Sequence, residues 1–253
     1  MMNQSHRLDE VWAALGTVTD PEIDESVTVL EFVSSMAVDA NNAVSIEFRL
    51  PTYWCAPNFA FLMASDMRDA VAELDWVNGV AVKLLDHFSA ELINRGVALK
   101  QEFRDAFPGE TDDDLQLIRQ KFLGKAFERR QELLMRYLLG VGQKPEWMAQ
   151  ASMKELMGLS LDSEGMRLRT LYIFAWRRLH PSWGEEDLVF VMLNGVPLDP
   201  TQLSSYLRKV AGVRRNAEFN GLICRSLLAE RKAETRVARR DDKHALNERR
   251  TSL

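Results

Sequence analysis

Residues 44–58 read VSIEFRLPTYWCAPN, and this stretch predicts a strand that runs into a short loop and then into a helix. In its first half apolar residues alternate with polar ones, which is typical of a strand with one face on a core and one in water. An apolar stripe that begins at Phe59 indicates the helix. Cys55 therefore lies at a strand-to-helix turn, close to a helix N-terminus, where a thiolate is stabilised.

The residues on either side of this stretch complete a small domain of mixed structure. A helix is expected over about 7–17 and a strand over about 27–33. After a helix over about 58–74, alternating apolar residues indicate a last strand over about 80–84. The order α-β-β-α-β predicts a small open sheet with helices on one face.

Strand patterns disappear after about residue 88, and helical patterns replace them. A short helix over about 203–210 is expected to be followed by a separate terminal helix that opens at Phe219. Short connections between helices favour an antiparallel bundle. We therefore predict the α+β class, with a sheet domain at 1–87, an all-helical domain at 88–240 and a flexible charged tail at 241–253.

Composition indicates a protein of the reducing cytoplasm that does not cross a membrane. The 253 residues contain no apolar run of the roughly 18 residues that a span requires, and the first residues show no apolar segment of a signal peptide. With two cysteines, no disulfide framework is expected.

Residues 208–250 carry 13 Lys and Arg against 6 Asp and Glu. We interpret this segment as an exposed charged helix rather than a nucleic-acid site, because its acids are interspersed and few aromatics are present to stack on bases.

Cys55 is the candidate metal-binding residue. A free cysteine is often a small buried hydrophobe, but a position in a loop between Pro51 and Pro57 favours a functional thiolate. One thiolate cannot hold a metal or a cluster alone, since such sites take about four ligands. The missing ligands would come from a second copy of the chain in a homodimer, from a client protein, or from Asp20 and Glu22. The alternative role of these two acids is to start a turn.

Three further residues are candidates for binding. Tyr53 and Trp54 are adjacent in the loop, so that both cannot easily point inward, and an exposed aromatic is an effective anchor for a protein partner. His87 follows the last strand and is the histidine to test, although a surface or capping role at the strand end is its alternative. Cys224 lies in an apolar part of the terminal helix and is interpreted as a packing residue.

Four features in order resemble the PaaD/SufT-like (MIP-eighteen type) domain family of iron–sulfur cluster assembly factors. They are a first helix followed by DPE at 20–22, the apolar LEFV at 30–33, the alternating strand, and the loop TYWCAP at 52–57 before a second helix. The family has a D-P-E segment, an L-G-L-V-like strand and a T-x-x-C loop with a nearby proline at these places. Glu31 replaces the family's glycine, and bulky Tyr53 and Trp54 replace small residues, which points to a loop adapted to a particular client.

The resemblance covers about a third of the chain and implies an assembly role rather than the turnover of a metabolite. It also implies that Cys55 is the metal or cluster ligand. The residues that we predict for the site are Asp20, Glu22 and Cys55 as metal ligands, with Thr52, Tyr53, Trp54, Pro57 and His87 as binding residues.

These observations predict a metallocentre maturation factor that is not an enzyme. It would hold iron or an iron–sulfur cluster transiently and load it into a client protein. The helical remainder is similar to extensions of relatives associated with multicomponent di-iron monooxygenases, so the client would be an apo non-haem iron oxygenase. Two alternatives stay open: a metal-independent chaperone or scaffold for an oxygenase subunit, and an enzyme in which Cys55 is the nucleophile and His87 its base.

Overall fold

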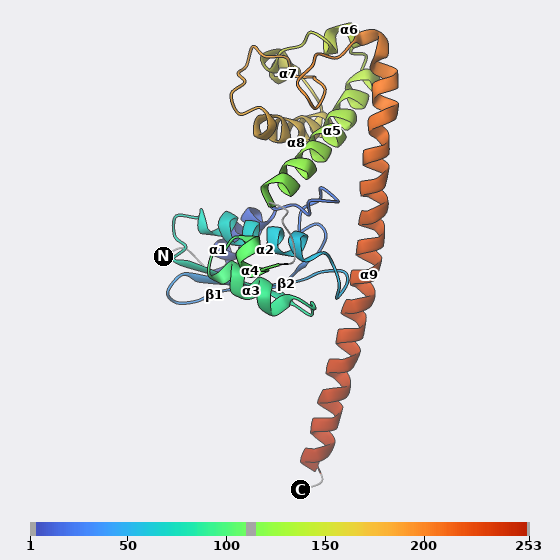
Figure 1. Ribbon diagram of the computed structural model, residues 1–253. Coiled ribbons are helices and arrows are strands. Elements are labelled where there is room, and N and C mark those ends of the chain that lie inside the picture. The colour runs from blue at the N-terminus through green and yellow to red at the C-terminus, as the bar shows by residue number, and fades with distance from the viewer. Residues whose placement is uncertain (1–3, 110–114, 252–253) are drawn as a thin grey trace. The chain divides into compact units, whose positions relative to one another are not determined.

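The computed structural model describes residues 4–109 and 115–251, with side chains described to residue 233, and it has the predicted α+β class (Figure 1). The elements in chain order are α1 (Gln4–Leu15), β1 (Val33–Val38), β2 (Ala43–Arg49), α2 (Pro57–Ala72), β3 (Gly79–Leu85), α3 (Ala90–Ala98), α4 (Phe103–Ala106), α5 (Leu115–Gly140), α6 (Pro145–Met148), α7 (Met153–Gly158), α8 (Ser163–Leu179), the 3-10 helix η1 (Pro200–Gln202) and α9 (Leu203–Thr251).

The chain packs as two compact units. The first, which we call the sheet unit, consists of Met1–Leu115 and Phe219–Leu253, and the second, the helical unit, is Gln116–Glu218. The domain boundaries expected near 87 and 240 stay a prediction. By packing, residues 88–109 and the part of α9 from Phe219 onward belong with the sheet.

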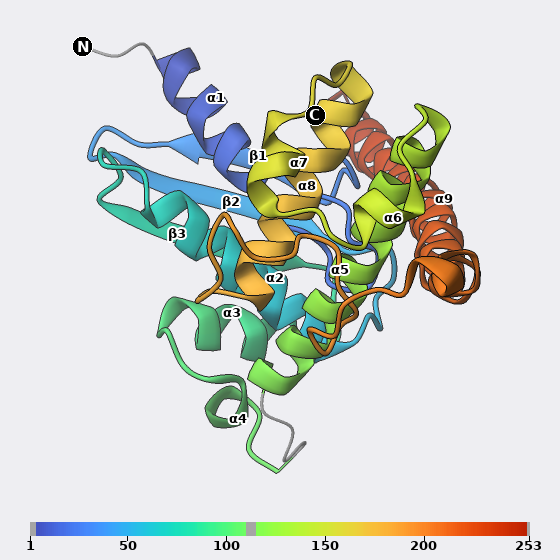
Figure 2. The ribbon, with the colours of Figure 1, turned by 90° about the horizontal axis from the view of Figure 1, so that it is seen from above.

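Three strands in the order β1–β2–β3 form the sheet (Figure 2). β1 pairs antiparallel with β2, with Val38 opposite Val44, and β2 pairs parallel with β3, with Ile46 opposite Val82. Parallel neighbours need a crossover connection, which α2 supplies. Val44, Ile46 and Phe48 are all buried, as the alternation in β2 predicts, so this face of the sheet carries the core.

Parallel pairing of β2 and β3 brings the carboxyl ends of both strands to one edge of the sheet. The Arg49 guanidinium at the end of β2 forms an ion pair with the Asp86 carboxylate after β3, with Nη2 and Oδ2 2.7 Å apart. The Phe88 amide donates to the Tyr53 carbonyl at 3.1 Å. The loop that follows β2 and the turn that follows β3 therefore lie side by side.

The strand predicted over 27–33 is wrong in position, since β1 spans Val33–Val38. Tight turns precede it: the Leu30 amide donates to the Ser26 carbonyl, and Glu31 has a φ of 57°. Val27 and Leu30 are buried by these turns. A turn can bury apolar residues at irregular spacing, and over so few residues an apolar run does not distinguish it from a strand.

In the helical unit the core lies between α5, α8 and the loop that precedes α9. Phe127 on α5 packs against Tyr172 on α8, with ring centroids 5.5 Å apart, and Trp176 is buried one turn farther along α8. The buried Gln131 amide accepts from the Tyr172 hydroxyl at 2.6 Å and donates to the Val191 carbonyl at 2.8 Å. These hydrogen bonds fix the irregular loop to the two helices, because buried polar groups require partners.

α9 is one helix of 49 residues where the sequence pattern predicts two. Residues 211–218 read AGVRRNAE and contain no proline. The single Gly212 costs only about 1 kcal/mol relative to alanine, so the helix continues through this segment and into the predicted tail. Residues 252–253 lie outside the described part. Neither α9 nor any other described helix is both long enough and apolar enough to cross a membrane.

Candidate functional site

The loop between β2 and α2 places Cys55 directly before a helix. Ala56 is the N-cap residue of α2, with φ −56° and ψ 125°, and Pro57 occupies the first turn, where its missing N–H costs no helical hydrogen bond. Cys55 is half-buried, and its Sγ lies 3.1 Å from the Thr52 Oγ1. This contact orients the sulfur, whichever of the two groups donates.

His87 is bound to the backbone of the same loop. Its Nε2 lies 2.7 Å from the Cys55 carbonyl oxygen, and its Nδ1 lies 3.1 Å from the Ser89 amide nitrogen. Since an amide can only donate, Nδ1 is the acceptor and Nε2 carries the proton that is donated to the carbonyl. Burial lowers the pKa of His87, which favours this neutral ring. The histidine thus supports the Cys55 loop through the backbone.

Asp20 begins a tight turn. Its Oδ1 accepts from the amides of Glu22 and Ile23 at 2.9 Å each, as an aspartate before proline is expected to do. The side chain is only 8% exposed, and burial raises its pKa to about 6 despite these two hydrogen bonds. Glu22 is exposed on the same turn.

Exposed aromatic side chains border the Cys55 loop. Trp54 is 74% exposed, and Tyr53 and Phe88 are each about half exposed, with their ring centroids 6.2 Å apart. Phe88 also stacks on the His87 ring at 4.8 Å between centroids. We call Tyr53, Trp54 and Phe88 the aromatic rim. Phe88 was not a predicted site residue, and the parallel pairing of β2 with β3 brings it here.

The part of α9 that belongs to the sheet unit lies along this end of the molecule. The Arg225 Nη1 and the Glu25 Oε2 are 2.6 Å apart, and the Lys232 Nζ lies 2.8 Å from the Glu31 Oε2. Arg231 donates to the Leu50 carbonyl at 2.8 Å, at the start of the Cys55 loop. These contacts attach α9 to the turn after Asp20 and to the end of β2.

Cys224, interpreted from the sequence as a packing residue, is half-buried on this part of α9. Burial raises its pKa to about 11, and the Asp20 carboxylate raises it in addition. Cys224 adjoins Arg225, which pairs with Glu25, so α9 brings this cysteine to the turn after Asp20. No local pattern could have shown this, since that turn and Cys224 are separated by most of the chain.

Within the described ranges no three or more His, Cys, Asp or Glu side chains are grouped so that they could hold a metal ion. Asp20 uses one carboxylate oxygen for the turn, and the Cys55 sulfur contacts Thr52. In the part of the chain that the structure describes, Asp20 and Glu22 therefore share one turn, and they are not preassembled with Cys55 as a metal site.

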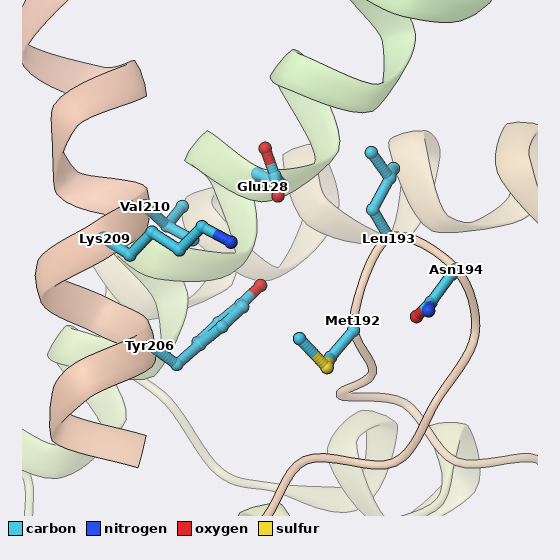
Figure 3. Close-up of a pocket in the computed structure, with 7 residues that line it drawn as sticks. All are labelled: Glu128, Met192, Leu193, Asn194, Tyr206, Lys209 and Val210. Carbon is cyan, nitrogen blue, oxygen red and sulfur yellow. The ribbon is translucent and has the colours of Figure 1, made fainter. Parts of the chain in front are cut away.

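A separate cavity of about 320 Å³ lies in the helical unit (Figure 3). Glu128 on α5 and Tyr206 and Lys209 on α9 border it, opposite the loop at Met192 to Asn194. Burial raises the pKa of Glu128, and the Lys209 charge opposes this shift. None of the residues predicted for the site lines this cavity.

Comparison with known proteins identifies the sheet-forming part of the chain. Residues 8–84 match the model of the iron–sulfur cluster assembly protein family. The crystal structure of a domain of unknown function, DUF59, from Bacillus anthracis is 23% identical in sequence and covers 38% of this chain and 92% of that chain, with a TM-score of 0.31. No curated protein matches the chain. The resemblance predicted from the DPE segment and the T-x-x-C loop is confirmed, and residues 8–84 form a domain of the iron–sulfur cluster assembly protein family.

Proposed function

We propose that this chain is a maturation factor that delivers iron or an iron–sulfur cluster to a client protein, and that it is not itself an enzyme. The observation that carries the proposal is the Cys55 loop: a thiol oriented by Thr52 and bordered by the aromatic rim, within an iron–sulfur cluster assembly domain. A thiolate is the usual protein ligand of cluster iron, and exposed aromatics are effective anchors for a protein partner. The loop thus combines a thiol that binds iron with an aromatic surface that contacts the client protein.

The cargo is held transiently. A single thiolate supplies one of the roughly four ligands that a metal or cluster takes. Ligands from the client would complete the set during transfer, and a second copy of the chain is the other source. A metal or cluster that this chain binds through one ligand is readily released to a client that offers all of the required ligands.

We infer that the client is an apo non-haem iron oxygenase, such as a subunit of a di-iron monooxygenase, in the cytoplasm. This inference follows only from the resemblance, stated from the sequence, of the helical remainder to extensions of relatives associated with di-iron monooxygenases. The helical unit lies outside residues 8–84, which match the family model, so it is the candidate for the surface that recognises one particular client.

The engagement of His87 supports assembly over catalysis by Cys55. A cysteine nucleophile needs a base within hydrogen-bond reach of its sulfur. Both ring nitrogens of His87 already bond to backbone groups, one to the Cys55 carbonyl and one to the Ser89 amide. The ring would have to give up one of these bonds before it could take a proton from the thiol.

Replacement of Cys55 with alanine should abolish iron delivery, because the thiolate that receives the cargo is lost. The measurement is the iron content and oxygenase activity of a candidate subunit from the same gene neighbourhood. The candidate subunit is expressed in three ways: together with the full chain, together with the Cys55→Ala chain, and without either chain. We expect iron in the Cys55→Ala sample to fall to the level of the subunit expressed alone. Ser34→Ala, at an exposed position of β1, is the matched control and should deliver iron normally.

Equal iron content in all of these samples would overturn the maturation role. If the subunit instead requires the chain for folding but tolerates Cys55→Ala, the protein is a metal-independent chaperone. Turnover of a small substrate that depends on Cys55 would favour the cysteine-dependent enzyme.

Replacement of Trp54 with alanine should weaken client binding about 10- to 30-fold, the effect of losing about 1.4–2 kcal/mol at an aromatic anchor. Calorimetric titration of the client with each variant measures this change. Trp12→Ala is the control, because Trp12 is also exposed, at 44%, but lies on α1. Equal weakening by both substitutions would show that the aromatic rim has no special role.

A further inference from the structure

The cavity of the helical unit has the size of a small-molecule site. Tyr206, Lys209 and Val210 line it from α9, and their spacing of three and four residues places them on one face of that helix. Glu128 lines it from α5. The volume of about 320 Å³ is that of about ten water molecules at about 30 Å³ each, and it falls within the range of about 300–1,000 Å³ that is typical of ligand pockets.

The loop that completes the cavity is held by hydrogen bonds and by packing. The Met192 amide donates to the Val196 carbonyl, and the Gly195 amide donates to the Met192 carbonyl, at 2.8 Å each. Leu193 packs against α5, where a Cβ atom at Gly124 would lie 3.1 Å from the Leu193 Cδ1. The apolar side chains of Met192 and Leu193 therefore form a fixed wall of the cavity.

The Tyr206 hydroxyl has a hydrogen that it can donate to a ligand. The Val191 backbone orients the Gln131 side chain, since Oε1 accepts from the Val191 amide at 3.3 Å and Nε2 donates to the Val191 carbonyl at 2.8 Å. Nε2 also donates to the Tyr206 hydroxyl at 2.6 Å, so the oxygen is an acceptor there and its own hydrogen points elsewhere. Burial raises the pKa of Tyr206 to about 12, so the hydroxyl keeps this hydrogen at neutral pH.

Two opposite charges border the same space. The Glu128 carboxylate is half-buried and Lys209 is exposed, and Figure 3 shows their polar ends grouped with the Tyr206 hydroxyl. Within residues 4–109 and 115–233, neither charge forms a hydrogen bond or an ion pair with another side chain or with the backbone. A carboxylate that is partly removed from water and left unpaired costs free energy, which a ligand with a donor group would recover.

We propose that this cavity binds an α-amino acid with an apolar side chain. The ligand carboxylate would accept from the Lys209 ammonium and the Tyr206 hydroxyl, and the ligand ammonium would donate to the Glu128 carboxylate. Its side chain would contact Met192 and Leu193. A zwitterion satisfies both charges of the cavity, whereas Glu128 would repel a simple anion and Lys209 would repel a simple cation. The inference goes beyond the proposed function and does not depend on it.

The first test is calorimetric titration of the full wild-type chain with L-leucine and, separately, with L-methionine at millimolar concentrations. Both amino acids should bind. Isocaproate lacks the ammonium group of leucine and isoamylamine lacks its carboxylate. Each analogue should bind about 10- to 100-fold more weakly than L-leucine, the effect of losing a hydrogen bond to a charged group. Failure of both amino acids to bind, or equal binding of either analogue, would overturn the inference, and this comparison requires no variant to fold.

Two substitutions locate the site. Glu128→Gln and Lys209→Met should each weaken L-leucine binding about 10- to 100-fold. Glu128→Gln should not weaken the binding of isocaproate, which has no ammonium group to lose a partner. Lys209→Met likewise should not weaken the binding of isoamylamine, which has no carboxylate.

Matched controls carry the same changes outside the cavity. Arg208→Met removes an exposed cation next to Lys209 on α9, and Glu146→Gln neutralises an exposed carboxylate on α6. Both controls should bind L-leucine as the wild type does, and circular dichroism checks that each variant is folded. Unchanged L-leucine binding in a folded Glu128→Gln or Lys209→Met chain would show that the ligand does not bind between these charges, and would overturn the inference.

Discussion

Asp20→Asn should stabilise the sheet unit by up to about 3 kcal/mol at pH 7.5, and this advantage should disappear near pH 4. Burial raises the pKa of Asp20 from 3.8 to about 6, so the folded protein holds a charged carboxylate at neutral pH at a cost in free energy. Because its pKa is raised, the Asp20 carboxyl binds a proton at a higher pH in the folded state than in the unfolded state. The contribution of Asp20 to the free energy of unfolding is therefore fully present below about pH 4 and is lost as the pH rises through about 6.

Asparagine removes this titration but keeps a carbonyl oxygen for the amides of Glu22 and Ile23. Urea unfolding of both proteins at pH 7.5 and pH 4 measures the change. Asp39→Asn is the matched control, because the exposed Asp39 carboxylate also accepts from two amides, those of Asn41 and Ala43. An advantage of Asp20→Asn that is the same at both pH values would contradict the role of burial.

Arg214→Met should destabilise the helical unit by about 3 kcal/mol, because it removes one of two partners from a buried carboxylate. Glu132 is fully buried, and its two oxygens accept from Arg136 and, at 3.0 Å, from the Arg214 Nε. The substitution leaves the charge of Glu132 with Arg136 alone, and Arg136 is about half exposed. Urea unfolding followed by circular dichroism measures the loss.

Two further variants test the cause. The double substitution Glu132→Met with Arg214→Met should recover most of the loss, since a buried ion pair can often be replaced by apolar residues at little cost. Arg167→Met breaks a pair with Glu164 in which both side chains are more than half exposed, and should cost less than about 1 kcal/mol. A double variant less stable than Arg214→Met alone would show that packing rather than charge dominates at Glu132.

Local features of the chain were predictable because they depend on neighbouring residues. The alternation over 44–50 predicts β2, and the apolar stripe after Pro57 predicts α2, so the position of Cys55 between them follows. The exposure of Trp54 follows from two adjacent large aromatics in a short loop. The strand expected over 27–33 failed because turns bury Val27 and Leu30, and the separate terminal helix failed because a single glycine does not end a helix.

The sequence by itself determined the family of the sheet domain, its order of elements, and the thiol before the second helix, since each is a pattern of spacing along the chain. Only the tertiary structure decided which residues meet that thiol. Parallel pairing of β2 and β3 brings His87 and Phe88 to the Cys55 loop, and α9 brings Arg231 to the Leu50 carbonyl at the start of this loop from the far end of the sequence. The physical reason is that packing joins residues distant in the chain, and no periodicity along the sequence records which of them it will join.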